Sequence, residues 1–227
     1  MDALKVALAW AFPGPRDEAS APGPASLALL PLLGLCQGVL LALAHEVWLA
    51  RYNLPASTEA LVLLSLYAIL TGGRPWRGLA EVVAGPGPRG GAARASGAAL
   101  AIVLFVLGAR ELVAIIAGVR DDISYPGAAL LAVWPAVGRW GSALAGQWME
   151  PQGASPLPFL AASSLLLALF FWEIPPAFFV APAAALAGAA VLPRVSQGAA
   201  PAARLDASAG MAEALYLVLA AALTLQY

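Results

Sequence analysis

Charged residues are scarce in this chain of 227 residues, because lysine, arginine, aspartate and glutamate together make up only 11% of it. The formal net charge is −1. The chain therefore has no broad basic surface of the kind that attracts nucleic acid, and we expect no nucleic-acid partner. The single cysteine, Cys36, excludes an internal disulfide and any metal site built from several thiolates. It lies in an apolar run, and we interpret it as a small core residue.

Apolar residues dominate instead, at 61% of the chain with a mean hydropathy of +0.81. This composition is too apolar for a soluble domain of this length and predicts an integral membrane protein in contact with lipid. A helix needs about 20 apolar residues to cross the bilayer core. The apolar runs are too continuous for the alternation of a membrane barrel. We therefore expect an all-α fold in which residues 1–227 form a single membrane domain.

Seven apolar runs are candidate spans, so the sequence predicts a bundle of six to seven transmembrane helices. They cover residues 25–48, 55–73, 96–117, 126–145, 157–172, 175–192 and 210–226. Residues 1–12 place Asp2 and Lys5 in a short apolar stretch, which predicts an amphipathic helix at the membrane interface. Small residues from Ala181 to Ala190 allow close helix packing, either within the chain or against a partner subunit.

Lysine and arginine are distributed unevenly about these spans. If the N-terminus is cytoplasmic, eight of them face the cytoplasm, namely Lys5, Arg16, Arg74, Arg77, Arg89, Arg94, Arg194 and Arg204. Only Arg51 and Arg120 then lie outside. Because cytoplasmic loops retain positive charge, this orientation is the predicted one. It makes residues 74–95 and 193–209 the largest cytoplasmic loops, both on the same membrane face.

The most specific motif runs from Gly72 to Gly85 and reads Gly-Gly-Arg-Pro-Trp-Arg-Gly-Leu-Ala-Glu-Val-Val-Ala-Gly. Without a gap, it resembles the motif Gly-Gly-x-His-x-Asp-Gly-x-x-Asp-x-x-Asp-Gly of the cobalamin synthase family. The glycine frame is kept. Pro75 stands at the position of the histidine, Arg77 and Ala84 stand at positions of aspartates, and only Glu81 keeps an acid.

Other segments extend the resemblance through most of the chain. Leu29 to Leu35 followed by Gly38 is similar to the family's opening helix, and Pro135 to Trp140 is similar to a segment whose arginine lies in the membrane. Asp206 and Glu213 match loosely an acidic helix near the family's C-terminus. The family comprises polytopic adenosylcobinamide-GDP ribazoletransferases of vitamin B12 synthesis. The resemblance thus implies a multi-pass protein of the bacterial inner membrane.

Repeated carboxylates beside a membrane suit Mg²⁺-assisted transfer at a pyrophosphate, because they hold the hard cation that neutralises the leaving group. Glu81, Asp206 and Glu213 are the candidate catalytic acids, with Glu81 and Asp206 as metal ligands. Asp206 and Glu213 are seven residues apart, which puts them on one helix face. Arg74 and Arg77 are candidates for holding a substrate phosphate. Mg²⁺ is expected only if transfer activity survives, and otherwise we expect no cofactor.

Four further polar residues interrupt apolar runs. His45, the only histidine, is a candidate haem or chlorophyll-type ligand or, alternatively, a polar group at the outer membrane interface. Arg110, Glu111 and Arg139 are candidate intramembrane polar residues, and the alternative is a structural Arg–Glu pair between neighbouring helices. None of these positions has a motif around it that decides between the two interpretations.

Residues 72–85 keep the glycines of the family motif but lack most of its acidic residues. This pattern favours one function over two others. The chain is predicted to be a degenerate cobalamin synthase-like protein, acting as a non-catalytic structural or accessory subunit among other membrane protein subunits. A divergent Mg²⁺-dependent ribazoletransferase is the first alternative. A pigment-binding or haem-binding membrane subunit that uses His45 is the second.

Overall fold

The computed structural model describes residues 2–15, 22–52, 54–84, 127–149, 175–195 and 199–224, and part of the stretch 99–116. Within these residues every regular element is a helix, which confirms the predicted all-α class. The helices are α1 (Asp2–Ala11), α2 (Pro24–Leu43), α3 (Ala56–Thr71), α4 (Arg74–Ala84), α6 (Gly127–Met149), α8 (Pro175–Val195) and α9 (Pro201–Thr224). A π-helical turn (Ala44–Leu49) and a 3₁₀ turn (Ala50–Tyr52) follow α2.

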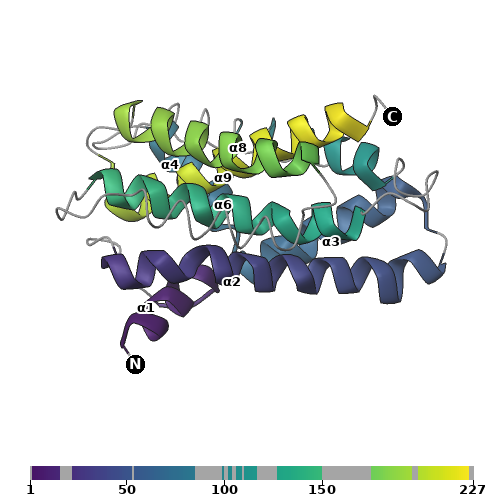
Figure 1. Cartoon of the computed structure of the whole chain (residues 1–227), viewed down its shortest axis with the longest axis horizontal. Helices are drawn as coiled ribbons and strands as arrows, with labels where there is room; N and C mark the ends of the chain where they lie inside the picture. The colour runs from purple at the N-terminus through teal and green to yellow at the C-terminus, as the bar shows by residue number, and fades with distance from the viewer. Residues whose placement is uncertain are drawn as a thin grey trace.

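Helix α6 is the centre of the bundle. It packs against α2, α8 and α9, and Figure 1 shows it lengthwise between α2 and α8. Every residue from Leu130 to Gly146 is buried. A helix that is apolar all round is stable only when neighbours cover all of its faces. The uniform sequence of α6 thus explains its central position.

Helices α2 and α6 approach closely because α2 has glycines four residues apart, at Gly34 and Gly38. A Cβ atom at Gly34 would lie 2.6 Å from the carbonyl oxygen of Pro135, and one at Gly38 would overlap the backbone of Ala132. Such pairs of small residues allow helix backbones to touch, and dispersion contacts then stabilise the pair. Any larger side chain at either position would push the two helices apart.

Small residues also bring α8 against α9. A Cβ atom at Gly188 would lie 2.8 Å from the backbone nitrogen of Ala212, and Ala181, Ala184 and Ala185 are all buried. The alanine-rich stretch of α8 therefore packs inside this chain. Packing within the chain is thus observed for the buried residues of this stretch, and its use against a partner subunit stays a prediction.

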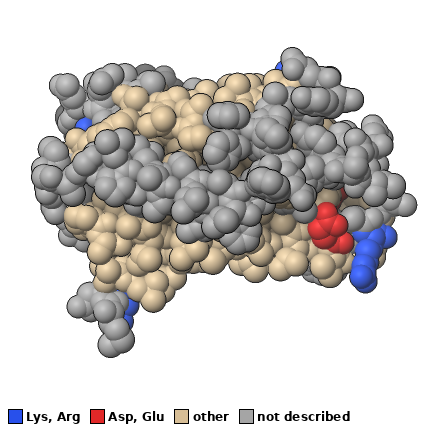
Figure 2. All heavy atoms as spheres, viewed as in Figure 1, with Lys and Arg blue, Asp and Glu red and all other residues tan. Residues whose placement is uncertain are grey.

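Two described helices are long and apolar enough to cross a membrane, Pro24–Val47 and Pro201–Ala222. A third span results if α3 and α4, which are bent by 77° at their junction, cross together. The described charged side chains on the face in Figure 2 lie toward the two ends of the long axis, and the described residues drawn between them are uncharged. A membrane protein is therefore supported, while the number of spans and the orientation stay predictions.

Most helix bounds agree with the predicted runs, but two predicted loops differ. Residues 74–84 form α4, and α9 begins at Pro201, nine residues before the predicted run at 210–226. Proline suits a first helical turn, and the alanine-rich sequence after it favours a helix despite its charges. The predicted span 157–172 and residues 85–95 lie outside the described residues, as do parts of the run 96–117.

The N-terminal segment is helical as predicted, and it is anchored to the bundle. Ala7, Trp10 and Ala11 are buried against it, while Leu4 and Leu8 are exposed on the other side of α1. Cys36 is exposed, so its interpretation as a core residue is wrong. It lies on the face of α2 that points away from α6.

Candidate functional site

The motif glycines Gly72 and Gly73 end α3 and redirect the chain into α4. Both have positive φ angles, 64° and 65°, which glycine adopts without strain. The Gly73 nitrogen donates to the Ala68 carbonyl oxygen over 2.9 Å, and the Gly72 nitrogen donates to that of Ile69 over 3.3 Å. This is the usual glycine-containing end of a helix. It makes the 77° bend that lays α4 across the N-terminal part of α9.

The third motif glycine, Gly78, lets α4 touch α9. A Cβ atom at this position would lie 2.5 Å from Cβ of Asp206 and 2.6 Å from the backbone nitrogen of Ala207. On the other side of the contact, a Cβ atom at Gly210 would lie 2.9 Å from the Pro75 carbonyl oxygen. The glycine frame of the motif therefore serves the packing of two segments that are distant in the sequence.

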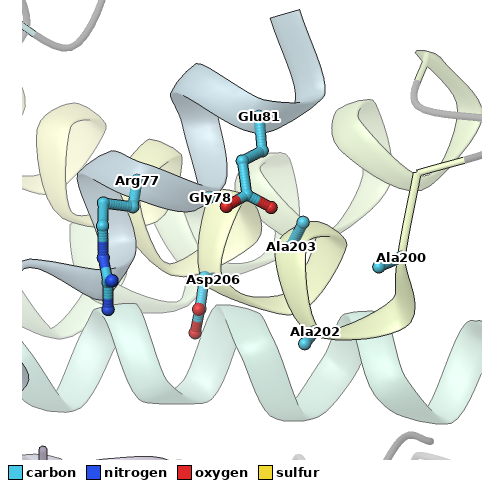
Figure 3. Close-up of a pocket in the computed structure, with 7 residues that line it drawn as sticks. All are labelled: Arg77, Gly78, Glu81, Ala200, Ala202, Ala203 and Asp206. Atoms are coloured by element: carbon cyan, nitrogen blue, oxygen red, sulfur yellow. The ribbon is translucent and has the colours of Figure 1, made fainter. Parts of the chain in front are cut away.

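Between these helices lies a pocket of about 30 Å³. Its charged lining residues are Arg77 and Glu81 from α4 and Asp206 from α9, shown in Figure 3. Residues 200, 202 and 203 complete the lining. Arg77 and Glu81 are exposed, whereas Asp206 is only 4% exposed. The structure thus brings together Glu81 and Asp206, the two predicted metal ligands, with the predicted phosphate-binding Arg77 beside them.

Glu213, the third candidate acid, lies in a different environment. It is 2% exposed and accepts a hydrogen bond from the Tyr67 hydroxyl. Its carboxylate lies over the backbone of α6, where a Cβ atom at Gly138 would overlap it. Trp134 packs on the Tyr67 ring with centroids 4.5 Å apart. Glu213 therefore belongs to a closed polar site among α3, α6 and α9, and it does not line the pocket of Glu81 and Asp206.

Arg74 and Arg139 both bind the C-terminal end of α1. Arg74 donates to the carbonyl oxygens of Ala9 (2.5 Å) and Gly14 (2.6 Å). Arg139 donates to those of Trp10 (3.2 Å) and Ala11 (2.7 Å). The last carbonyls of a helix lack partners within it and carry the negative end of its dipole, so cations stabilise them.

These contacts change the interpretation of both arginines. Arg74 is 4% exposed and does not line the pocket, so its predicted role in holding phosphate is not supported by its position. Arg139 is buried in the bundle as predicted, but its observed hydrogen bonds go to carbonyl oxygens of α1 rather than to a carboxylate. Gln37 contributes a further hydrogen bond, to the Ala11 carbonyl oxygen over 2.7 Å.

His45 pairs with an acid inside the protein. It is buried in the π-helical turn after α2, and its Nδ1 lies 2.5 Å from Oε1 of Glu59 on α3. Its Nε2 lies 3.9 Å from Oε1 of the exposed Glu46. This pair joins α3 to the end of α2. Haem or pigment ligation by His45 stays a prediction, and it would have to use the Nε2 side of the ring.

Arg110 and Glu111 differ from the predicted pair between helices. The Arg110 side chain is 80% exposed, and its Nε lies 4.0 Å from Oε1 of Glu111, its own neighbour in the chain. This contact is too long and too exposed to contribute much stability. Glu111 is partly buried. Among the described parts of the chain, this contact does not identify a binding site at Arg110 or Glu111.

No group of three His, Cys, Asp or Glu side chains within the described residues is arranged to hold a metal ion. Glu81 and Asp206 supply two carboxylates to one pocket, which is a donor set that Mg²⁺ uses together with substrate phosphates. Arg77 in the same pocket opposes a cation electrostatically. The donor set is therefore weaker than the acidic motif that this segment resembles.

Sequence reasoning missed Tyr67, Trp134 and Gly138, which build the closed site. One signal was present for Tyr67. Glu59, Tyr67 and Thr71 recur at helical spacing within an apolar run, and all three are buried on one face of α3. Polar side chains repeated on one face of a membrane helix indicate an interior polar site. No comparable signal distinguishes Trp134 or Gly138 from ordinary core residues.

No protein-family model, no curated protein and no solved structure matches this chain.

Proposed function

We propose that this chain is a non-catalytic, cobalamin synthase-like membrane protein that serves as a structural or accessory subunit of a membrane complex. The observation that carries the proposal is the separation of the three candidate acids. Glu81 and Asp206 share a pocket with Arg77, while Glu213 is bonded to Tyr67 elsewhere. The pocket therefore holds two carboxylates and one guanidinium.

The geometry also supports a retained scaffold. The two segments that carry the sequence resemblance, residues 72–85 and the acidic part of α9, pack on each other through Gly78. Pro75, Arg77 and Ala84 stand where the motif has its histidine and two of its aspartates. In this proposal the chain has kept the scaffold of the family and has lost most of the catalytic side chains. Arg74 and Arg139 then have a structural role, because both hold α1 against the bundle.

The same proposal includes the membrane arrangement expected from the sequence. Six to seven spans with a cytoplasmic N-terminus would place the α4–α9 pocket on the cytoplasmic face of a bacterial inner membrane. Exposed apolar side chains on α2, among them Leu32, Val39, Leu40 and Leu43, would then contact lipid or a partner subunit. The exposed side of α1, with Leu4, Lys5 and Leu8, suits the membrane interface.

Complementation tests the proposal. The chain is produced in a bacterial strain that lacks its own cobalamin synthase, and growth that depends on vitamin B12 synthesis is measured. We expect no growth, because the pocket lacks the acids and the histidine of the motif that it resembles. Growth at the rate given by an intact synthase would contradict the proposal. Immunoblots of membrane fractions establish that both proteins are present in equal amounts.

A rebuilt variant is the matched control. The substitutions Pro75→His, Arg77→Asp, Glu81→Asp and Ala84→Asp restore the motif on the scaffold of this chain. Partial growth with this variant, and none with the natural sequence, would show that the lost side chains rather than the scaffold prevent the reaction.

A divergent Mg²⁺-dependent ribazoletransferase is the second candidate, and the pocket itself favours it. Glu81 and Asp206 could hold one ion together with substrate phosphates, and Arg77 could contact a phosphate. Purified protein would then join α-ribazole or its phosphate to adenosylcobinamide-GDP, with release of GMP. This candidate requires that Glu81→Gln abolish product formation. If the variant made product at an unchanged rate, Glu81 would not be a metal ligand, and this candidate function would be contradicted.

A further inference from the structure

A small cavity lies beside the closed polar site, separate from the α4–α9 pocket. It is lined by Leu64, Trp76, Gly108, Trp134, Gly210, Glu213, Ala214 and Leu217. The space open to the centre of a water-sized sphere is about 10 Å³. A cavity needs roughly 10–15 Å³ by this measure to hold one water molecule. The cavity is therefore of the size for a single water.

Two polar atoms on the residues that line this cavity have no hydrogen-bond partner among the described residues. They are Oε2 of Glu213 and Nε1 of Trp134, on side chains that are 2% and 1% exposed. A buried polar group without a hydrogen-bond partner destabilises the folded protein. Both residues line the cavity, so one molecule bound in it would satisfy both groups.

The chemistry of the two atoms selects the class of ligand. The indole Nε1–H of Trp134 can only donate, so the ligand must offer an accepting lone pair. A metal ion or an ammonium ion has none. The Glu213 oxygen needs a donor when the carboxyl group is ionised. A hydroxyl group meets both demands, and water is the hydroxyl compound that fits the volume.

We propose that one water molecule is bound in this cavity, accepting a hydrogen bond from Trp134 Nε1 and pairing with Glu213 Oε2. Tyr67 already donates to the other oxygen of Glu213. The water thus completes a hydrogen-bonded junction that joins α3, α9 and α6. The proposal does not depend on the function of the chain, since it concerns the interior of the bundle.

Nuclear magnetic resonance on the full chain in lipid nanodiscs, with ¹⁵N-labelled tryptophan, tests the proposal. The measurement is the Overhauser cross-peak between each indole proton and water. We expect a cross-peak with the sign of a bound water at Trp134. Trp140 is the internal control, because its Nε1 is also buried without a partner but it does not line this cavity. Trp134→Phe and Trp140→Phe assign the two signals.

A variant that fills the cavity makes the test decisive. At Gly108, an added Cβ atom would make ordinary contact with Leu217 at 3.7 Å, so Gly108→Ala fills cavity space without a clash. We expect it to remove the Trp134 cross-peak while the other indole signals stay in place. Absence of the cross-peak in the natural protein would overturn the proposal. So would equal cross-peaks at Trp134 and Trp140, or a cross-peak unchanged by Gly108→Ala.

Discussion

Two acids on the same helix lie in opposite kinds of environment. Asp206 lines a pocket open to the surface, together with Glu81 and Arg77. Glu213, two turns further along α9, accepts a hydrogen bond from Tyr67, lies against the backbone of α6 and lines a smaller, largely apolar cavity. Spacing alone groups these two acids into one site. The two acids are separated because Asp206 faces Gly78 of α4, whereas Glu213 faces Gly138 of α6 and Tyr67 of α3.

The difference teaches that the neighbours of an acid decide its chemistry. Near Asp206 the facing helix brings exposed charged side chains and access for a ligand. Near Glu213, α3 brings the Tyr67 hydroxyl as a donor and α6 brings the aromatic ring of Trp134. The open pocket is thus the part of the molecule that offers several charged groups to a ligand. The closed site is the part that holds helices together.

The largest expected effect comes from breaking the closed site at Gly138. In Gly138→Val the new side chain would overlap the Glu213 carboxylate, and α6 would have to move from α9. We expect a loss of about 3 kcal/mol in the free energy of unfolding, the upper range for an overpacked core. Thermal unfolding in detergent micelles measures it. Gly14→Ala is the control, since nothing lies within 4 Å of that position.

Gly78→Ala tests the packing that forms the open pocket. Its Cβ atom would lie 2.5 Å from Cβ of Asp206, so α4 must shift relative to α9. Since α4 is a peripheral helix, we expect a smaller loss of stability, about 1–2 kcal/mol. Cysteine cross-linking between residues 81 and 203, which line the pocket from the two helices, reports the shift. Cross-linking as efficient as with Gly78 would show that the close approach is not needed.

Tyr67→Phe removes one hydrogen bond from the closed site and leaves its shape intact. Interhelical hydrogen bonds in membrane proteins contribute about 0.6 kcal/mol on average, so we expect a loss of about 1 kcal/mol or less. A double-mutant cycle with Glu213→Gln isolates the pair. Effects of the two substitutions that simply add would mean that Tyr67 and Glu213 do not interact.

Glu81→Gln is expected to change stability least, by less than about 0.5 kcal/mol, because this side chain is exposed in the open pocket. It sharpens the comparison with Glu213→Gln, which alters the closed site. Unfolding measurements on both variants under the same conditions compare the two losses of stability. A larger loss for Glu81→Gln than for Glu213→Gln would reverse the roles assigned to the two regions.

Much of the fold is predictable from apolar runs alone. The predicted ranges 55–73 and 126–145 lie within a few residues of the ends of α3 and α6. Helix α4 was missed because it is too short and too charged to be a membrane span and follows two glycines, although Arg74, Arg77 and Glu81 recur at helical spacing. The early start of α9 was missed because Arg204 and Asp206 resemble loop charges, although packing against α4 and α6 covers them.

The candidate site was predictable only in part. The proximity of Glu81 and Asp206 agrees with the expectation that the two segments share a membrane face. The separation of Glu213 could not be foreseen, because its partner Tyr67 lies 146 residues away in the sequence. The hydrogen bonds of Arg74 and Arg139 to α1 could not be predicted either, because every residue has a backbone carbonyl group and the sequence does not indicate which of them accepts a hydrogen bond.

The proposed role as an accessory subunit is tested most directly by native mass spectrometry of the protein, extracted gently from its own membrane. We predict a stable complex that contains at least one other protein and carries no corrinoid mass. The partner should remain bound to the Glu81→Gln variant, because the role does not use the pocket's chemistry. A monomer or homo-oligomer that carries a corrinoid would contradict the proposal and would favour the transferase.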